Sequence, residues 1–223
     1  PILEASIVLD RGTPTLTRIS VERPDTARPA DTDGDGLDDL VVYTNQRDIV
    51  VNLVNPSGGV RIRYEKKEDS NENCSINTNL ENVVDYVGPF SVHFNSDGNK
   101  KVCVAIEDAV GNVSGKKNVI FTIDTTPPPA PTLPRNNLPG VNASCAYVEA
   151  SRTEVNDFWK FQLRASGGVW SDLTDGNQKG GADLFDPADN ADTAFVKFDL
   201  TQDTDNLLQI RVVDLAGNVS EPS

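Results

Sequence analysis

A short phrase that occurs twice constrains this chain more than any other feature of its sequence. Residues 102–114 read Val-Cys-Val-Ala-Ile-Glu-Asp-Ala-Val-Gly-Asn-Val-Ser, and residues 208–220 read Leu-Gln-Ile-Arg-Val-Val-Asp-Leu-Ala-Gly-Asn-Val-Ser. The copies are 106 residues apart (214 minus 108), which is about the length of one β-sandwich domain. We therefore predict two copies of one module.

Each copy is predicted to be a strand followed by a tight turn. The apolar residues take alternate positions, as a strand with one buried face requires: Val102, Val104, Ile106, Leu208, Ile210 and Val212. Each strand ends in an Asp-x-x-Gly-Asn turn, at Asp108 and at Asp214. Gly111 and Gly217 can adopt a positive φ in these turns without steric cost.

After the first copy the sequence continues as an expected strand over 118–124 and a proline-rich linker, Thr-Thr-Pro-Pro-Pro-Ala-Pro, over 125–131. The order of strand, Asp-x-x-Gly-Asn-x-Ser turn, strand and Asp-Thr-Thr-Pro-Pro resembles the bacterial Ig-like repeats of large surface adhesins and other extracellular proteins. The resemblance is specific at the C-terminal end of both modules and loose elsewhere. It implies an all-β fold of two tandem immunoglobulin-like β-sandwiches joined by a proline-rich linker.

The expected organisation has three parts. Residues 1–14 form a strand and linker, residues 15–126 an Ig-like domain, and residues 127–223 a second Ig-like domain without its last strand. Residues 1–10 echo the strand and linker that follow the first repeated phrase. Either the chain is an excerpt of a longer array, or residues 1–10 are a donor strand that completes the sheet edge of another copy and builds a head-to-tail filament.

The stretch Asp-Thr-Asp-Gly-Asp-Gly-Leu-Asp-Asp at 31–39 is the most explicit chemical motif. Alternating carboxylates on a glycine-containing loop suit Ca²⁺, which prefers six to eight oxygen ligands. The predicted ligands are the side chains of Asp31, Asp33, Asp35 and Asp39 and the carbonyl of Leu37. The motif resembles loops of FG-GAP repeats, dockerins and EF-hands, although Val42 stands where an EF-hand has its bidentate Glu. The alternative is a solvated acidic loop.

Other aspartates are weaker candidates for a cation site. Residues 183–192 are acidic but lack the alternating glycines of the first loop. The adhesin resemblance suggests that Asp10 and Asp124, in the linkers, join the turns in holding an interdomain Ca²⁺. Otherwise Asp108 and Asp214 accept backbone hydrogen bonds within their own turns.

Charge and hydropathy exclude several partners. The 20 basic and 34 acidic residues give a formal net charge of -14, which would repel nucleic acid and anionic membrane surfaces. No apolar run approaches the roughly 18 to 20 residues that span a bilayer.

Three cysteines allow one disulfide. A bridge between Cys74 and Cys103 would close a loop of 29 residues and stabilise the fold by about 3 kcal/mol, and it would indicate an oxidising, extracellular setting. The alternative is three unpaired thiols.

No catalytic motif is present. His93, the single histidine, has no evident Ser or Cys partner and is expected on the exposed face of a strand, so we predict that the protein is not an enzyme. Trp159 is expected in the core of the second module. Trp170, beside a glycine-rich turn, either stacks on a sugar or packs on its own sheet.

The sequence thus predicts an extracellular structural and adhesive protein: a calcium-rigidified Ig-like spacer of a bacterial surface adhesin, or a filament subunit assembled by β-strand complementation. Its expected partners are neighbouring copies or adjacent repeats, and a cell-surface glycan or protein. The alternative is a carbohydrate-binding or accessory region of a secreted enzyme, with Trp170 as the contact.

Overall fold

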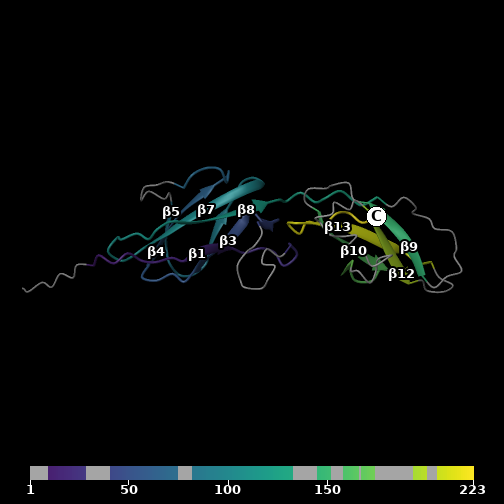
Figure 1. Cartoon of the computed structure of the whole chain (residues 1–223), viewed down its shortest axis with the longest axis horizontal. Helices are drawn as coiled ribbons and strands as arrows, with labels where there is room; N and C mark the ends of the chain where they lie inside the picture. Colours follow the sequence, from purple (N-terminus) through teal and green to yellow (C-terminus); the bar gives the residue numbers. More distant parts are fainter. Residues whose placement is uncertain are drawn as a thin grey trace, which may run out of the picture. The chain divides into compact units, whose positions relative to one another are not determined.

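The computed structural model describes residues 10–28, 41–74, 82–132, 145–151, 158–165, 167–173, 193–199 and 205–223 (Figure 1). Over these ranges the chain forms thirteen strands and no helix, which confirms the all-β prediction. No helix in the described ranges is long and apolar enough to cross a membrane. Residues 1–9 and the predicted calcium loop lie outside them.

Two sheets make up the first module within the described residues. One has the order β1 (Arg18–Val21), β3 (Asp48–Val54), β6 (Phe90–His93). The other has the order β2 (Val42–Thr44), β8 (Lys117–Ile123), β7 (Gly98–Glu107), β4 (Arg61–Lys67), β5 (Asn82–Asp85). The registers recorded for β1–β3, β3–β6, β4–β5, β4–β7 and β7–β8 are all antiparallel.

The core of the first module is built from alternate residues of both sheets, as the sequence pattern predicts. Its buried members include Leu16, Ile19, Val21, Val51, Ile62, Val92, Val102, Val104 and Ile106. Phe94 and Phe121 meet edge to face, with ring centroids 5.4 Å apart. Ring contacts of this kind add about 0.5–1.5 kcal/mol to the burial of their area.

The second module has the sheet β11 (Ser171–Asp172), β10 (Phe158–Ala165), β13 (Leu208–Asp214) and the antiparallel pair β12 (Thr193–Asp199), β9 (Cys145–Ser151) among its described residues. Phe158, Phe161, Ile210 and Val212 form its described core. The alternation predicted for the second repeated phrase is therefore correct.

The prediction for Trp159 is wrong. The pairing of β10 with β13 shifts register between Phe158 and Lys160, so the strict alternation from Trp159 to Phe161 is broken at a bulge. Phe158 is buried in place of Trp159, which is half-buried and has the ammonium group of Lys160 3.8 Å from its ring centroid.

The two repeated phrases have the same fold. Val113 bridges to Glu107 beside β7, and Val219 bridges to Val213 beside β13. Farther along, Ser223 exchanges two backbone hydrogen bonds with Ile210, as a partner of β13. Ser223 therefore occupies the position that Lys117, the first residue of β8, occupies in the first module, where Lys117 pairs with Val104.

The chain divides into two compact units between Ile123 and Asp124, with two exceptions. The short segments Pro24–Pro29 and Tyr43–Asn45 belong to the second unit, although they precede the linker in the sequence.

Candidate functional site

The Asp-x-x-Gly-Asn turn of the first module is closed by its own aspartate. One carboxylate oxygen of Asp108, Oδ1, accepts hydrogen bonds from the backbone N–H of Val110 (2.9 Å) and of Asn112 (2.8 Å). The other, Oδ2, accepts one from the side-chain amide of Asn112 at 2.7 Å. Gly111 has a φ of 95°, as predicted for this position. Backbone hydrogen bonding within the turn, one of the two predicted roles of this aspartate, is therefore present.

The same asparagine also holds the segment that precedes the module. The Nδ2 atom of Asn112 donates to the carbonyl of Gly12 at 3.0 Å and lies 3.4 Å from that of Asp10. These residues are about one hundred positions away in the sequence. The turn at one end of the module is thus tied to the chain that enters it.

The second turn repeats this arrangement. The backbone N–H of Asn218 donates to Oδ1 of Asp214 at 2.8 Å, and its side-chain amide donates to Oδ2 of Asp214 and to the carbonyl of Asp124, each at 2.8 Å. Asp214 has no exposed surface. Asp124 directly follows β8, so the start of the linker ahead of the second module is held in the same way. We call each such contact of an Asn amide with a linker carbonyl a linker clamp.

The two clamps differ in their surroundings. A Cβ atom added to Gly217 would lie 2.7 Å from Oγ1 of Thr26 and 2.9 Å from the backbone N of Ala27, whereas one added to Gly111 would meet only Oε1 of Glu107, at an ordinary contact distance of 4.0 Å. In the second unit, the backbone N–H of Arg28 also donates to the carbonyl of Leu215 at 3.1 Å. Glycine is therefore required at 217 for close approach as well as for its φ of 88°.

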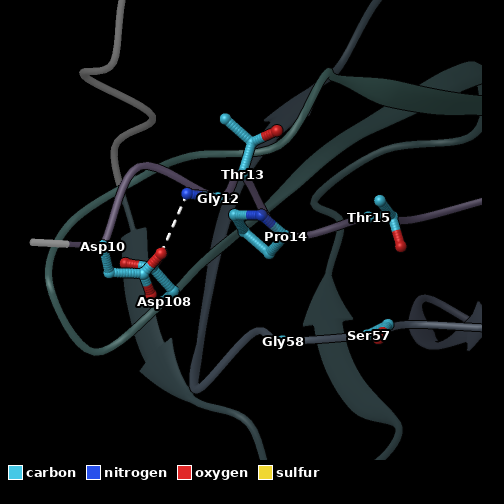
Figure 2. Close-up of a pocket in the computed structure, with 8 residues that line it drawn as sticks. All are labelled: Asp10, Gly12, Thr13, Pro14, Thr15, Ser57, Gly58 and Asp108. Atoms are coloured by element: carbon cyan, nitrogen blue, oxygen red, sulfur yellow. Dashed lines mark hydrogen bonds between the residues drawn. The ribbon is translucent and has the colours of Figure 1, made fainter.

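A pocket of about 250 Å³ lies beside the first clamp and is lined by Asp10, Gly12, Thr13, Pro14, Thr15, Ser57, Gly58 and Asp108 (Figure 2). Burial raises the pKa of Asp108, but hydrogen bonds from Asn112 and the turn backbone more than offset this and hold it below its usual value. The described residues contain no group of three or more His, Cys, Asp or Glu placed to hold a metal ion. Hydrogen bonds account for the geometry of this turn.

The residues predicted to bind calcium, Asp31, Asp33, Asp35, Leu37 and Asp39, lie outside the described residues, as does the acidic stretch 183–192. Calcium binding therefore stays a prediction from the sequence.

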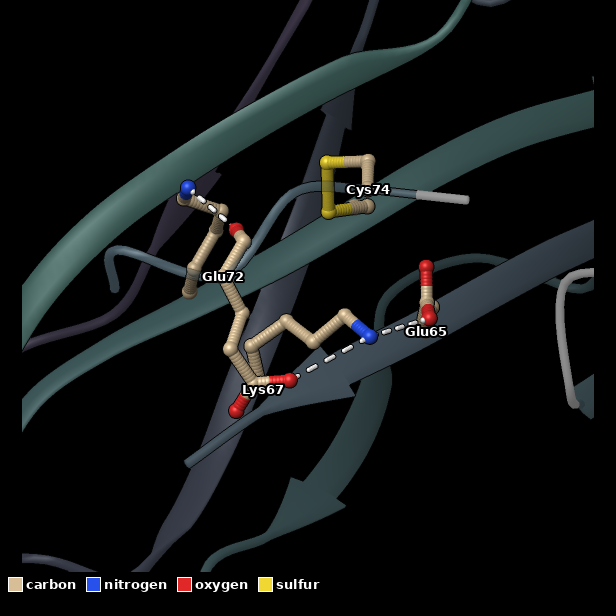
Figure 3. Close-up of a disulfide and its surroundings, with 6 residues drawn as sticks. Glu65, Lys67, Glu72 and Cys74 are labelled. Atoms are coloured by element: carbon tan, nitrogen blue, oxygen red, sulfur yellow. Dashed lines mark hydrogen bonds and ion pairs between the residues drawn. A yellow bond between two sulfur atoms is a disulfide. The ribbon is translucent and has the colours of Figure 1, made fainter. Parts of the chain in front are cut away.

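The disulfide that the sequence left open is present between Cys74 and Cys103 (Figure 3). It ties the loop after β4 to β7. Ion pairs surround it: Nζ of Lys67 lies 2.5 Å from Glu65 and 3.5 Å from Glu72. The hydrogen bond to Glu65 raises the pKa of Lys67, although burial opposes this.

Trp170 packs over its own sheet, one of its two predicted positions. Its ring centroid lies 4.6 Å from the guanidinium carbon of Arg164 on β10 and 4.2 Å from that of Arg211 on β13. His93 lies on the exposed face of β6, as predicted, with Nδ1 2.8 Å from a carboxylate oxygen of Asp48. Of these features, sequence analysis missed the contacts of the Asn amides with the linkers. The recurrence of an Asp in each linker was the available signal.

Comparison with known proteins gives a fold and no family. No protein-family model matches the chain, and no curated protein is similar to it in sequence. Among solved structures, the fibronectin(III)-like modules of Clostridium thermocellum CbhA are similar over 92% of this chain and 90% of theirs, with a TM-score of 0.53 and 8% identity.

Two adhesin structures are also similar. A 1.5-MDa bacterial ice-binding adhesin matches 91% of this chain and 60% of its own, with a TM-score of 0.33 and 15% identity. A tetra-tandem repeat from the extending region of a large adhesion protein matches 83% and 46%, with a TM-score of 0.28 and 15% identity. Of the three, the CbhA modules alone exceed a TM-score of 0.5, and they show that the chain has the Ig-like, fibronectin(III)-like sandwich fold.

Proposed function

We propose that the chain is an extracellular structural and adhesive protein whose Ig-like modules act as a spacer of a bacterial surface adhesin. The linker clamps are the observation that carries this proposal. In both modules an Asn side chain fixes the backbone of the segment that enters the module. A string of such modules has linkers whose first residues are anchored to the module that follows, which suits a protein that must extend.

The disulfide and the charge support the extracellular setting. Disulfides persist in oxidising compartments and are rare in the cytosol. A net charge of -14 helps to keep an exposed protein soluble.

Spin-label distance measurements on the full chain test the clamp. Labels are attached at V83C and V169C, two exposed positions, in a chain that also carries C145S. We expect one distance distribution that broadens in Asn218→Ala. The matched control is Asn112→Ala, which removes the same contact ahead of the first module and should leave the distribution unchanged. Equal distributions for the unsubstituted chain and Asn218→Ala would contradict the proposal.

The same proposal includes a structural Ca²⁺ at Asp31, Asp33, Asp35, Leu37 and Asp39. Without a cation, neighbouring carboxylates on this stretch repel one another by about 1 kcal/mol per close pair in water. Calorimetric titration with CaCl₂ should release or absorb heat, and Ca²⁺ at one hundred times its Kd should stabilise the fold by about 2.7 kcal/mol. Asp33→Asn with Asp35→Asn should abolish both effects. The absence of heat and of any change in Tm in the unsubstituted chain would overturn this part.

Strand complementation is the second way in which such modules could gain length. Along β13, Ile210 pairs with Ser223 in the register that Val104 and Lys117 use in the first module. Among the described residues β13 is at the edge of its sheet, and we propose that a strand with a sequence like that of residues 1–9, which resembles β8, pairs there.

Light scattering of the full chain and of a chain without Pro1–Leu9 tests this assembly. The shorter chain keeps Asp10 and therefore the first clamp. Polymers of the full chain that the deletion abolishes would support a filament subunit. Monomers in both cases would rule out filament assembly and leave the spacer role.

A further inference from the structure

The outward-facing residues of equivalent strands differ between the modules. In the first, Arg63 lies opposite Ala105 and Glu65 opposite Cys103. In the second, the same registers place Gln162 opposite Arg211 and Arg164 opposite Gln209. The second module thus carries two arginines and two glutamines where the first carries an ion-paired and disulfide-linked face in which Glu65, Cys103 and Ala105 are buried.

The two arginines are held in place by the two glutamines. Nε and Nη2 of Arg164 donate to the side-chain oxygen of Gln209 at 2.8 and 2.5 Å. Nε and Nη2 of Arg211 donate to that of Gln162 at 2.9 and 2.7 Å. The amide of Gln162 in turn donates to Asp172 at 2.7 Å. These bonds fix the planes of both guanidinium groups and leave Nη1 of each without an acceptor among the described residues.

The positive charge on this face is not neutralised by the described carboxylates. Asp172, which β11 brings to the same face, is bound by Lys160 at 2.7 Å and by Gln162. Both guanidinium groups lie against Trp170, within 8.8 Å of each other at most (4.6 plus 4.2 Å). Burial lowers the pKa of Arg211, and the charge of Arg164 lowers it further. Neighbouring like charges on a sheet are destabilising, so an anion placed between them would relieve the repulsion.

We propose that this face, defined by Gln162, Arg164, Trp170, Gln209 and Arg211 and called the Arg–Trp face, binds the carboxylate of an acidic sugar on an otherwise neutral glycan. This goes beyond the spacer role, because it gives the chain a ligand.

The charge distribution favours this ligand over other anions. Fixed guanidinium groups suit a carboxylate, which can accept two parallel hydrogen bonds. The net charge of -14 repels densely charged polymers such as nucleic acid or acidic peptides, but penalises a single carboxylate far less. The half-buried indole beside exposed Val169 offers an apolar surface on which the C–H groups of a sugar ring can pack.

The test is a titration of the full chain, followed by NMR, with an oligosaccharide that ends in glucuronic acid. The comparison ligands are the methyl ester of the same oligosaccharide, a sulfated oligosaccharide of equal length and polyglutamate. We expect binding of the glucuronide, with shifts of the Trp170 indole and the two arginine side chains, and at least tenfold weaker binding of the three other ligands.

Variants distinguish specific recognition of the carboxylate from general electrostatic attraction. Arg211→Gln and Arg164→Gln should each weaken binding about tenfold or more, because charged hydrogen bonds are lost. Arg211→Lys keeps the positive charge but loses the paired N–H donors of the guanidinium group, so it should weaken binding several-fold. Lys160→Gln is the matched control: it removes one positive charge from the same face, where the ammonium group lies over Trp159, and should change affinity about twofold or less. Cooperative melting curves close to that of the unsubstituted chain show that the variants are folded.

Four results would overturn the proposal. The first is equal binding of the glucuronide and its methyl ester. The second is tighter binding of polyglutamate or of the sulfated sugar. The third is an equal loss of affinity for Lys160→Gln and Arg211→Gln. The fourth is no binding of the glucuronide at all.

Discussion

The outer faces of the two modules show how one fold can carry two different surfaces. On β4 and β7 the charged groups neutralise one another: Arg63 donates to Glu107, and Arg61 lies 3.8 Å from the same carboxylate. On the same face of β10 and β13, Arg164 and Arg211, at the positions of Glu65 and Ala105, bond to glutamine oxygens and contact Trp170. The strands and registers are shared, so the fold does not determine the difference. The charged groups of the first face pair with one another, whereas the second face retains hydrogen-bond donors.

The largest difference should come from the disulfide, which the described part of the second module lacks. Replacing Cys74 and Cys103 together by Ala should destabilise the first module by about 3 kcal/mol, because a loop of 29 residues is no longer closed in the unfolded chain. Denaturation followed by circular dichroism reports both modules. Tryptophan fluorescence reports the second alone, since Trp159 and Trp170 both lie there. A shift of the fluorescence transition would show that the modules unfold together.

The second-largest difference in stability is expected when the turn glycines Gly111 and Gly217 are replaced by Ala. Ala at 217 must adopt a positive φ and also contact Thr26, so Gly217→Ala should cost about 2 kcal/mol, seen as an earlier fluorescence transition. Gly111→Ala meets only the backbone penalty and should cost about 1 kcal/mol, seen by circular dichroism alone. Equal costs would show that the approach to Thr26 is not tight in solution.

The ion pair of the first face should make that module sensitive to acid. The hydrogen bond from Arg63 lowers the pKa of Glu107, against burial, which raises it. The unfolded chain then takes up the proton first as the pH falls, so the stabilisation is present above the unfolded pKa of about 4.3 and is lost below it.

Replacing Glu107 by Gln should therefore cost about 1.5 kcal/mol at pH 7 and clearly less at pH 3, measured by urea denaturation. At the equivalent position the second module has Val213, so its fluorescence transition should not change at either pH. A cost that is the same at both pH values would contradict the role of the carboxylate.

The smallest effect is expected on the Arg–Trp face. Arg211 is half-buried and contributes a stacking contact and hydrogen bonds to a neutral amide. Arg211→Gln should change the free energy of unfolding by about 0.5 kcal/mol, because it also removes the repulsion from Arg164. A loss of more than about 2 kcal/mol in the fluorescence transition would indicate that the arginine serves the fold itself.

Much of the fold could be predicted from alternation alone. In a strand with one buried face, apolar residues occupy every second position of the sequence. This pattern correctly placed Val102, Val104 and Ile106 in the core. The prediction failed at Trp159 because a bulge inserts one residue, and nothing in a single sequence marks that residue.

The functional features were harder to predict, since they depend on contacts across the chain. The pairing of Arg211 with Gln162 follows from the strand register, and the place of Trp170 follows from the turn before β11. The sequence was compatible with the disulfide but equally with free thiols. The turn residues were evident as a motif, but the contact of Asn218 with Asp124 joins positions 94 residues apart.

The mobility of the linker backbone tests the central claim most directly. In ¹⁵N relaxation measurements on the full chain, the amides of Asp124, Thr125 and Thr126 should have order parameters of about 0.85, as in the adjoining β8 strand. Asn218→Ala should lower them toward about 0.6 or less, and Asn112→Ala should not. Values below about 0.6 in the unsubstituted chain would show that the clamp does not hold the linker, and would contradict the spacer role.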